Sequence, residues 1–394
     1  MNDFTFARRT NWQNETNALN KAVETLKAQG ASILDLTVSN PTECGFFYPA
    51  NLLSVLSSSD NLRYDPDACG IKEAREVVFN YYAKPKVKGS IDDIVLTAST
   101  SEAYSFLMRL LINPGEKVLV PAPSYPLFQF LLEINDVNFA QYPLVYDGEW
   151  RMDIQALESL VDEKTRAIIL VNPNNPTGSY VGKSELVQLN NICERHQLTL
   201  ISDEVFFDYA FYQGDFVSLL GNDRVLTFVL GGLSKTLGLP QMKCAWILSS
   251  GPQALLKDAQ DRLSIIADTY LSVNTPVQNA LRSWLGMAPG IQEQIMARVK
   301  ENAAWLKAQL RAHTEILSIQ GGWYAVLRIP AIKSEEEWCL EFVREDQVLV
   351  YPGYFFDFPK EAYIVVSLLP EKALFQQGIS RIMSRLDEKI VEEV

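Results

Sequence analysis

The chain alternates short apolar runs with longer segments whose apolar residues recur at helical spacing. The apolar runs predict strands at Ile33–Val38, Ile94–Leu96, Lys117–Val120, Ala167–Val171, Thr199–Ser202 and Val225–Leu230. The helical spacing predicts helices at Asn14–Gln29, Gly70–Tyr82, Glu102–Leu111, Pro252–Ile266 and Thr275–Trp284. Short apolar strands between helices are typical of a parallel sheet that helices cover on both faces. We therefore predict an α/β fold whose large domain holds a mostly parallel sheet of the seven-stranded type.

The pattern changes near Ala288-Pro289-Gly290, which we interpret as a domain boundary. Beyond it, a long helix precedes predicted strands at Tyr324–Ile329, Val348–Val350 and Tyr363–Ser367, and a final helix follows. This order predicts a smaller α+β domain at 288–394 after a large domain at 47–287. The first segment, 1–46, could pack with either domain, and we favour the small one.

Charge and composition exclude several classes of protein. With 35 Lys and Arg against 48 Asp and Glu, the formal net charge is −13, which disfavours general binding to nucleic acid or anionic membranes. No apolar run approaches a membrane span, and the start of the chain lacks the apolar core of a secretion signal. The five cysteines are scattered and only two histidines occur, so neither a metal site nor a His-based triad is indicated. We expect a cytoplasmic protein.

Ligands of α/β proteins bind at the carboxyl ends of the strands, so the loops there are informative. The loop after Ile94–Leu96 is Thr97-Ala98-Ser99-Thr100-Ser101-Glu102, which opens a helix. Hydroxyl groups, backbone N–H groups and the helix dipole would form an anion site there that suits one phosphate. The same residues also fit a simple capping box, and both interpretations stay open.

Three further residues follow predicted strands at the same edge. Two Asn-Pro steps in Asn172-Pro173-Asn174-Asn175-Pro176-Thr177-Gly178 predict a rigid turn that holds the Asn175 amide as a donor. Asp203 ends a buried strand, where a carboxylate needs a cationic partner in the protein or on a ligand. Lys235 follows a Gly-Gly turn and is a candidate Schiff-base nucleophile.

Together these loops resemble those of the class I/II aminotransferases, which are pyridoxal 5′-phosphate enzymes of fold type I. The likeness covers nearly the whole chain and includes Ser-Asp-Glu-Val and Leu-Ser-Lys-Thr-x-Gly-Leu-Pro after the Asn-Pro turn. Pro123-Ser124-Tyr125-Pro126 resembles the segment whose aromatic ring stacks on the cofactor. Arg63-Tyr64-Asp65-Pro66 resembles the segment whose tyrosine crosses a dimer interface, and Tyr351-Pro352-Gly353 the small-domain turn.

The resemblance implies a role for each matching residue. Lys235 would form the Schiff base and move protons, and Asp203 would pair with the protonated ring nitrogen. Asn175 would bind the ring 3′-oxygen and Tyr125 would stack on the ring. The phosphate would be held by Ser99, Thr100, Ser101, Ser234, Lys243 and Tyr64 of the partner subunit, in a homodimer.

Four positions depart from the family pattern. Phe206 replaces a Tyr that donates to the 3′-oxygen, Lys243 replaces an Arg, and Gly232 replaces a Ser for which Ser234 could substitute. The largest departure is Val365, because an apolar side chain cannot pair with a substrate carboxylate as the family's Arg does. Asn40 and Arg328 are weaker substrate candidates, and Arg328 is more simply explained as a solvated strand residue. We therefore expect an atypical substrate, with aspartate and glutamate poor donors.

The leading hypothesis is an aminotransferase that moves an amino group between an amino donor and a keto acid, in amino-acid metabolism or biosynthesis. One alternative is a lyase of the same fold that eliminates a sulfur group from the β-carbon, with the same Lys235 and Asp203. Another is a non-catalytic binding protein that keeps the cofactor fold. Glycine motifs for nucleotides and a DNA-binding segment are not evident in the sequence.

Overall fold

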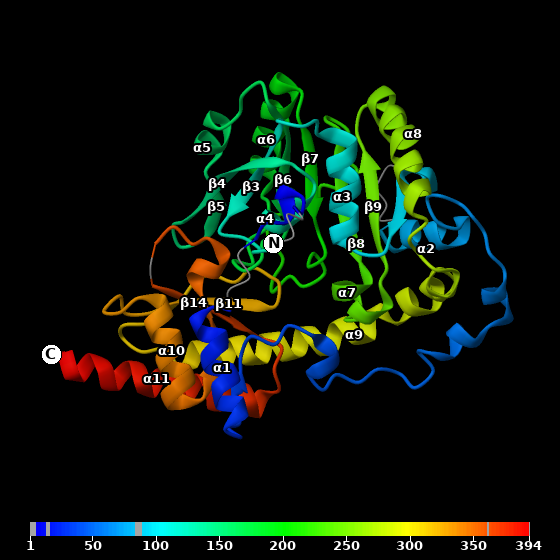
Figure 1. The fold of residues 1–394 in the computed structure, drawn as a ribbon. Coiled ribbons are helices and arrows are strands. Elements are labelled where there is room, and N and C mark those ends of the chain that lie inside the picture. Colours follow the sequence, from blue (N-terminus) through cyan, green and yellow to red (C-terminus); the bar gives the residue numbers. More distant parts are fainter. Residues whose placement is uncertain (1–4, 13–15, 83–88, 361, 394) are drawn as a thin grey trace.

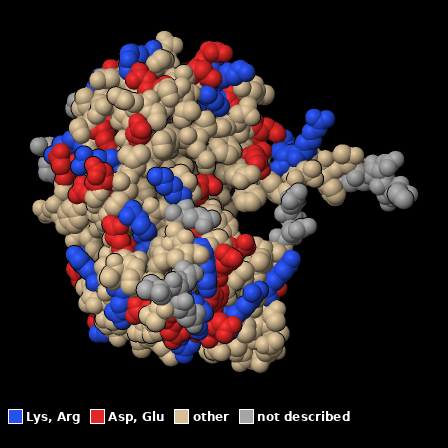
Figure 2. Space-filling view, turned by 90° about the vertical axis from the view of Figure 1, so that its left-hand side faces the viewer, with Lys and Arg blue, Asp and Glu red and all other residues tan. Residues whose placement is uncertain are grey.

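The computed structural model describes residues 5–12, 16–82, 89–360 and 362–393. It consists of a large α/β part and a smaller part, and the long helix α9 (Thr275–Ala308) runs beneath both (Figure 1). Acidic and basic side chains are interspersed over the face drawn in Figure 2. None of the described helices is both long and apolar enough to cross a membrane.

The described part of the large sheet has eight strands in the order β2-β9-β8-β7-β6-β3-β4-β5. Their bounds are β2 Ile94–Thr97, β3 Lys117–Ala122, β4 Asn138–Tyr146, β5 Trp150–Met152, β6 Thr165–Val171, β7 Thr199–Asp203, β8 Thr227–Gly232 and β9 Ala245–Ser250. The strands from β8 through β7, β6 and β3 to β4 are parallel, while β9 runs antiparallel to β8 and β5 antiparallel to β4. The predicted mostly parallel α/β sheet is confirmed. The sequence had assigned no strand to β4, β5 or β9.

Successive residues of the buried strands point to opposite faces, and each face has its own layer of helices. One face, which includes Val118, Ile201 and Phe228, packs against α3, α4 and α8. The other face, which includes Leu119, Leu200 and Val229, packs against α2, α5 and α6. The helices of the large part are α2 Lys72–Tyr82, α3 Thr100–Leu111, α4 Phe128–Ile134, α5 Ile154–Ser159, α6 Lys183–His196, α7 Leu233–Thr236 and α8 Gln253–Tyr270.

The smaller part holds an antiparallel sheet in the order β10-β11-β14-β13, covered by α10 (Glu335–Asp346) and α11 (Lys372–Glu393). The bounds are β10 Glu315–Ile316, β11 Tyr324–Arg328, β13 Tyr351–Pro352 and β14 Tyr363–Ser367. These elements match the α+β order that the sequence predicts beyond residue 290.

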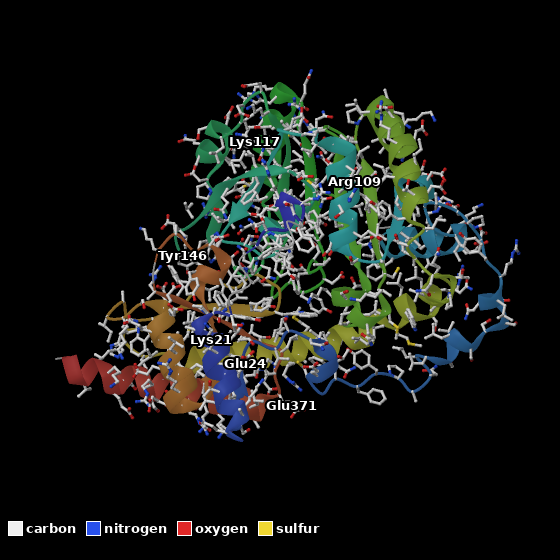
Figure 3. All side chains as sticks on the ribbon, viewed as in Figure 1. Lys21, Glu24, Arg109, Lys117, Tyr146 and Glu371 are labelled. Atoms are coloured by element: carbon white, nitrogen blue, oxygen red, sulfur yellow. The ribbon has the colours of Figure 1, made fainter. Side chains whose placement is uncertain are left out.

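The N-terminal segment divides between the two parts. Helix α1 (Ala18–Ala28) packs on α10, and β1 (Leu34–Asp35) pairs in parallel with β12 (Val348–Leu349). Lys21 and Glu24 of α1 accordingly lie among the helices of the smaller part (Figure 3). Residues 8–12 instead lie against α4 of the large part, where Trp12 donates to Glu133 at 2.6 Å. Within the segment 1–46, α1 and β1 thus contact elements that lie beyond residue 288, whereas residues 8–12 contact α4, and the assignment of the whole segment to the small domain stays a prediction.

Two expectations about helices need correction. The separate helices expected on either side of Ala288-Pro289-Gly290 are one helix, because α9 continues through Pro289. A proline removes one helical hydrogen bond, but Trp284, Ala288 and Ile291 are buried on one stripe and hold the helix in place. The domain limits of 47–287 and 288–394 stay predictions. The expected helix at Asn14–Gln29 begins at Ala18, and Asn14 itself lies outside the described residues.

Candidate active site

The predicted site residues follow strand ends that lie side by side at one edge of the large sheet. The register pairs Thr97 of β2 with Ala245, and Ala245 with Gly232 of β8. Further along, Asp203 of β7 pairs with Val171 of β6. The loops that carry Ser99–Ser101, Lys235, Asp203 and Asn175 therefore leave the sheet at the same edge, as the sequence predicts.

Lys235 lies on the short helix α7, directly after β8, and its amine is largely enclosed by aromatic rings. Its Nζ is 4.9 Å from the ring centroid of Trp323 and 5.3 Å from that of Phe206. The amine makes no hydrogen bond or ion pair to the described residues. Loss of hydration lowers the pKa of Lys235 to about 8, although the charge of Asp203 opposes this shift. An unpaired amine with a lowered pKa is suited to nucleophilic attack on a carbonyl group.

Asp203 ends β7 with its side chain on the α3 face of the sheet. Tyr104 of α3 donates a hydrogen bond to its Oδ2 at 3.1 Å, and the backbone N–H of Val205 donates to Oδ1 at 3.2 Å. Burial raises the pKa of Asp203 to about 6, while these two bonds and the charge of Lys235 lower it. The carboxylate is therefore held in place but lacks a direct cationic partner among the described residues. A cation on a ligand would stabilise it.

The Asn-Pro turn is buried from Asn172 to Tyr180 and is fixed by its own side chains. Asn174 accepts from the hydroxyl of Thr177 at 2.9 Å, and Asn172 donates to the carbonyl of Val217 at 2.9 Å. Asn175 differs, because its buried Oδ1 has no hydrogen-bond partner in the described part of the chain. A buried amide oxygen without a partner is uncommon in folded proteins, and a hydrogen-bond donor on a ligand at this sheet edge would satisfy it.

The start of helix α3 shows which of its polar groups remain available. Ser99 is the N-cap and accepts from the N–H of Glu102 at 3.1 Å, while Glu102 accepts from the N–H of Ala98 at 2.7 Å. Ser99 is thus the N-cap, as the capping interpretation expects, whereas Glu102 accepts from the residue before the N-cap and does not form the reciprocal bond of a capping box. Thr100 and Ser101 form the first turn, whose N–H groups have no helical partner and suit an anion.

The remaining phosphate and ring candidates have different degrees of exposure. Ser234 is half-buried beside Lys235, and Lys243 is exposed just before β9, at the same sheet edge. Tyr125 follows β3 and is 41% exposed, and loss of hydration raises the pKa of its hydroxyl, with a smaller contribution from the nearby charge of Asp203. Tyr64 is 66% exposed on an extended loop and does not join the site within a single chain.

The three substrate candidates lie apart from one another. Val365 is fully buried in β14, in register with Val326 of β11. Arg328 lies at the far end of β11 and forms an ion pair with Glu315 at 2.6 Å, so the structure does not bring it to Lys235. The Asn40 side chain is engaged locally, since it accepts from Thr42 at 2.8 Å and donates to Glu43 at 2.9 Å.

The segment before β11 also lies beside Lys235, although nothing in the sequence pattern predicts it there. Gly178 has φ +72°, and a Cβ there would meet the carbonyl oxygen of Gly321. The segment before β11 is also held by backbone bonds from Phe211 to Gln320 at 2.8 Å and from Gly322 to Tyr209 at 3.1 Å. This close contact brings Trp323 to Lys235. Only the pair of glycines at 321 and 322 marks the segment in the sequence.

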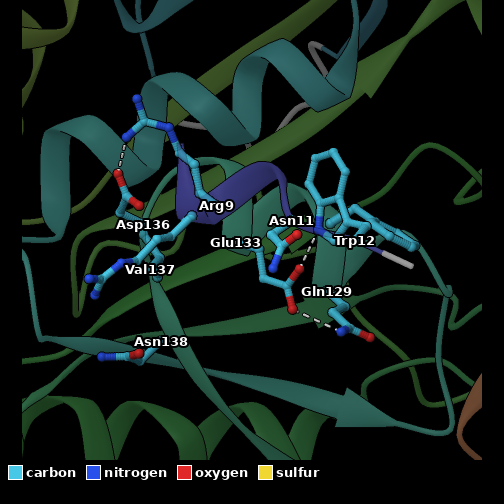
Figure 4. A pocket seen from close by; sticks show the side chains of 10 residues that line it. Arg9, Asn11, Trp12, Gln129, Glu133, Asp136, Val137 and Asn138 are labelled. Carbon is cyan, nitrogen blue, oxygen red and sulfur yellow. Dashed lines mark hydrogen bonds and ion pairs between the residues drawn. The ribbon is translucent and has the colours of Figure 1, made fainter. Parts of the chain in front are cut away.

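A separate hollow of about 660 Å³ lies between the N-terminal segment and α4 (Figure 4). Its side chains are already engaged with each other, since Glu133 accepts from Trp12 and from Gln129, and Arg9 pairs with Asp136. None of the predicted site residues lines it. We assign it no part in the site.

Comparison with known proteins identifies the family. Residues 49–375 match the family described as aminotransferase class I and II. A glutamate–pyruvate aminotransferase of Haemophilus influenzae is 29% identical over 377 residues, which cover 92% of this chain and 93% of that protein. An aminotransferase structure from Escherichia coli superposes with a TM-score of 0.85 at 25% identity, over 98% of each chain. An alanine aminotransferase structure from Pyrococcus furiosus shares the fold with a TM-score of 0.88 at 24% identity, over 98% of this chain and 100% of that one.

The fold and these strand-end loops are those of an enzyme that transfers amino groups. The chain belongs to the class I and II aminotransferases. The family implies pyridoxal 5′-phosphate as the cofactor and an amino acid and a keto acid as substrates. The predicted fold, family and enzyme class are thereby confirmed.

Proposed function

We propose that Lys235 binds pyridoxal 5′-phosphate covalently and that Asp203 pairs with the nitrogen of its ring. The observation that carries this proposal is the enclosed, unpaired amine of Lys235 near the partly buried carboxylate of Asp203, which lacks a direct cationic partner among the described residues. When bound, this cofactor withdraws electrons from the carbon that bears the substrate amine. The Asn175 side chain at the same sheet edge supports the fit, because its N–H would donate to an oxygen of the ring, while its Oδ1, which has no partner among the described residues, could accept from a ligand donor.

Each of these residues would have a separate role, which follows from its charge and its position. With a pKa of about 8, Lys235 is partly neutral near pH 8 and can accept a proton from the substrate carbon and return it. With a pKa of about 6, Asp203 is ionised at neutral pH and favours a protonated ring nitrogen. Tyr125 would lie against the ring, and the first turn of α3 with Ser234 and Lys243 would hold the phosphate.

The proposed reaction is the transfer of an amino group from an amino donor to a keto acid. To test this, the protein is loaded with pyridoxal 5′-phosphate and each donor of a broad panel of amines is added separately. The absorbance of the cofactor is then recorded for each donor. We expect one class of donor to convert the cofactor to its amine form, and a keto acid to reverse the change. Release of pyruvate and ammonia from a sulfur amino acid, without that reversal, would favour the lyase alternative.

We also propose that the protein is a homodimer in which Tyr64 serves the neighbouring site. Its support is the exposure of two large side chains on this otherwise polar loop, Leu62 at 90% and Tyr64 at 66%. The test mixes Lys235→Ala and Tyr64→Ala chains, each inactive or nearly so alone. Random pairing leaves one intact site in each mixed dimer, so about a quarter of the wild-type activity should return. No recovery after subunit exchange would contradict the shared site. Location in the cytoplasm stays a prediction.

A further inference from the structure

Helix α7, which carries Lys235, depends on other segments for its position. It has a single turn of four residues, and so short a helix is not stable by itself. Gln292 of α9 donates to the carbonyl of Thr236 at 3.0 Å. Tyr48 donates to the carbonyl of Gly238, just after the helix, at 2.7 Å. Side chains from distant parts of the chain therefore bond to the backbone around Lys235.

The backbone of Lys235 itself is bonded by Tyr209. The Tyr209 hydroxyl donates to the carbonyl of Lys235 at 2.6 Å, and the Tyr209 side chain is fully buried. The N–H of Gly238 also bonds to this carbonyl, at the longer distance of 3.3 Å. Burial raises the pKa of Tyr209 well above its ordinary value, with a smaller contribution from Asp208, so the hydroxyl stays protonated and remains a donor. The bond therefore fixes the backbone from which the amine extends.

The ring of Tyr209 lies against a side chain that covers the amine. Its centroid is 5.1 Å from that of the Trp323 ring, in an edge-to-face arrangement. The Trp323 ring centroid is in turn 4.9 Å from Nζ of Lys235. The backbone carbonyl of Tyr209 also accepts from the N–H of Gly322, the residue before Trp323, at 3.1 Å. Tyr209 thus joins the backbone of Lys235 to the segment that encloses its amine.

Tyr209 belongs to the same loop as two other groups of the site. Asp203 ends β7, and it is followed by Phe206, whose ring centroid is 5.3 Å from Nζ of Lys235. The carbonyl of Phe206 accepts from the N–H of Tyr209 at 3.0 Å, which closes a tight turn. This loop therefore carries the candidate carboxylate, one ring against the amine and the hydroxyl that holds the Lys235 backbone.

We propose that Tyr209 is a positioning residue, which keeps the amine of Lys235 between the rings of Phe206 and Trp323. This inference rests on the proposed function, because it concerns the residue that would carry the cofactor. Tyr209 acts through Lys235 and not by contact with the reacting atoms. Without its hydroxyl the Lys235 backbone is free to shift, and an amine that leaves the two rings regains water.

The first test measures the Lys235 amine in the cofactor-free protein. Wild type and Tyr209→Phe are labelled with a trace of acetic anhydride from about pH 6 to about pH 11, and the labelled Lys235 peptide is quantified by mass spectrometry. The dependence of labelling on pH gives the pKa of the amine. We expect a pKa of about 8 in the wild type. In Tyr209→Phe, which keeps the ring, the pKa should be higher by at least about half a unit, because the amine is better hydrated.

Tyr48→Phe is the matched control. It removes the same kind of bond from the same loop, but at Gly238, three residues after Lys235. In this control the pKa of Lys235 should stay within about 0.2 of the wild-type value. A general loosening of the loop would instead change the pKa in both variants alike. Equal changes in the two variants, or an unchanged pKa in Tyr209→Phe, would overturn the proposal.

A second measurement separates this inference from the proposed function. The three proteins are incubated with increasing concentrations of pyridoxal 5′-phosphate and reduced with borohydride, and the adduct on Lys235 is quantified. We expect Tyr209→Phe to need at least about threefold more cofactor than the wild type or Tyr48→Phe for half-maximal adduct. An equal requirement would contradict the positioning role. No adduct on Lys235 in any of the proteins would overturn the proposed function, while the labelling would still decide the role of Tyr209.

Discussion

The hydroxyl of Tyr104 donates a hydrogen bond to Oδ2 of Asp203 at 3.1 Å. The bond joins α3, whose first turn would hold the phosphate, to the residue that would face the ring nitrogen. It also favours the charged form of a carboxylate whose pKa burial has raised to about 6.

Substitution Tyr104→Phe should therefore shift the pH dependence of cofactor binding. Without the bond the pKa of Asp203 rises further, by up to about one unit. Affinity for pyridoxal 5′-phosphate should then fall at a higher pH than in the wild type, because protonated Asp203 cannot pair with a ring cation. The dissociation constant of pyridoxal 5′-phosphate, measured at a series of pH values from 5 to 8, gives the pH at which half of the affinity is lost, and the two proteins are compared at this midpoint. Tyr180→Phe, whose hydroxyl donates to the carbonyl of Phe207 at 3.1 Å, should leave the midpoint unchanged.

The lowered pKa of Lys235 predicts how the stability of the cofactor-free protein depends on pH. Between about 8, the folded value, and 10.5, the ordinary value, the unfolded chain binds more protons than the folded one. Stability of the wild type should therefore rise with pH in this window relative to Lys235→Met, by at most about 3 kcal/mol. Urea unfolding of both proteins at pH 7.5 and pH 10 gives the difference. A constant or falling difference would mean that the amine is not desolvated.

The contact between Gly178 and Gly321 predicts a strong effect of a single methyl group. Gly178→Ala combines an unfavourable φ of +72° with a clash against the Gly321 carbonyl, so it should separate Trp323 from Lys235. We expect a loss of at least about 2 kcal/mol beyond that of Gly115→Ala, together with most of the amino transfer. Gly115 is the matched control, since it has φ +89° and nothing within 4 Å of an added Cβ. An equal loss of the free energy of unfolding in Gly178→Ala and Gly115→Ala would show that the contact between Gly178 and Gly321 is unimportant.

The sequence located Lys235, Asp203 and Asn175 because each follows a buried strand whose apolar run is visible in the chain. Tyr104 was missed because it lies inside a helix, where one polar group among buried apolar neighbours gives no sign of its partner. Trp323 was missed for a different reason. It reaches Lys235 through contacts between segments far apart in the chain, which periodicity does not encode.

Local rules also failed where packing outweighs them. Proline disfavours a helix interior, yet α9 continues through Pro289 because its buried stripe packs along the whole molecule. Arg328 looked like a substrate candidate in the sequence, but strand register places Glu315 directly opposite it. In the first case the structure is determined by packing against residues distant in the sequence, and in the second by the register of the strands.

The most direct test of the account is to map the lysine that binds the cofactor. The protein is loaded with pyridoxal 5′-phosphate, reduced with borohydride, digested and examined by mass spectrometry, with Lys235→Ala and the exposed Lys257→Ala treated in parallel. We expect a reduced adduct on Lys235 in the wild type and in Lys257→Ala, and its loss in Lys235→Ala. An adduct on another lysine, or one that persists in Lys235→Ala, would contradict it.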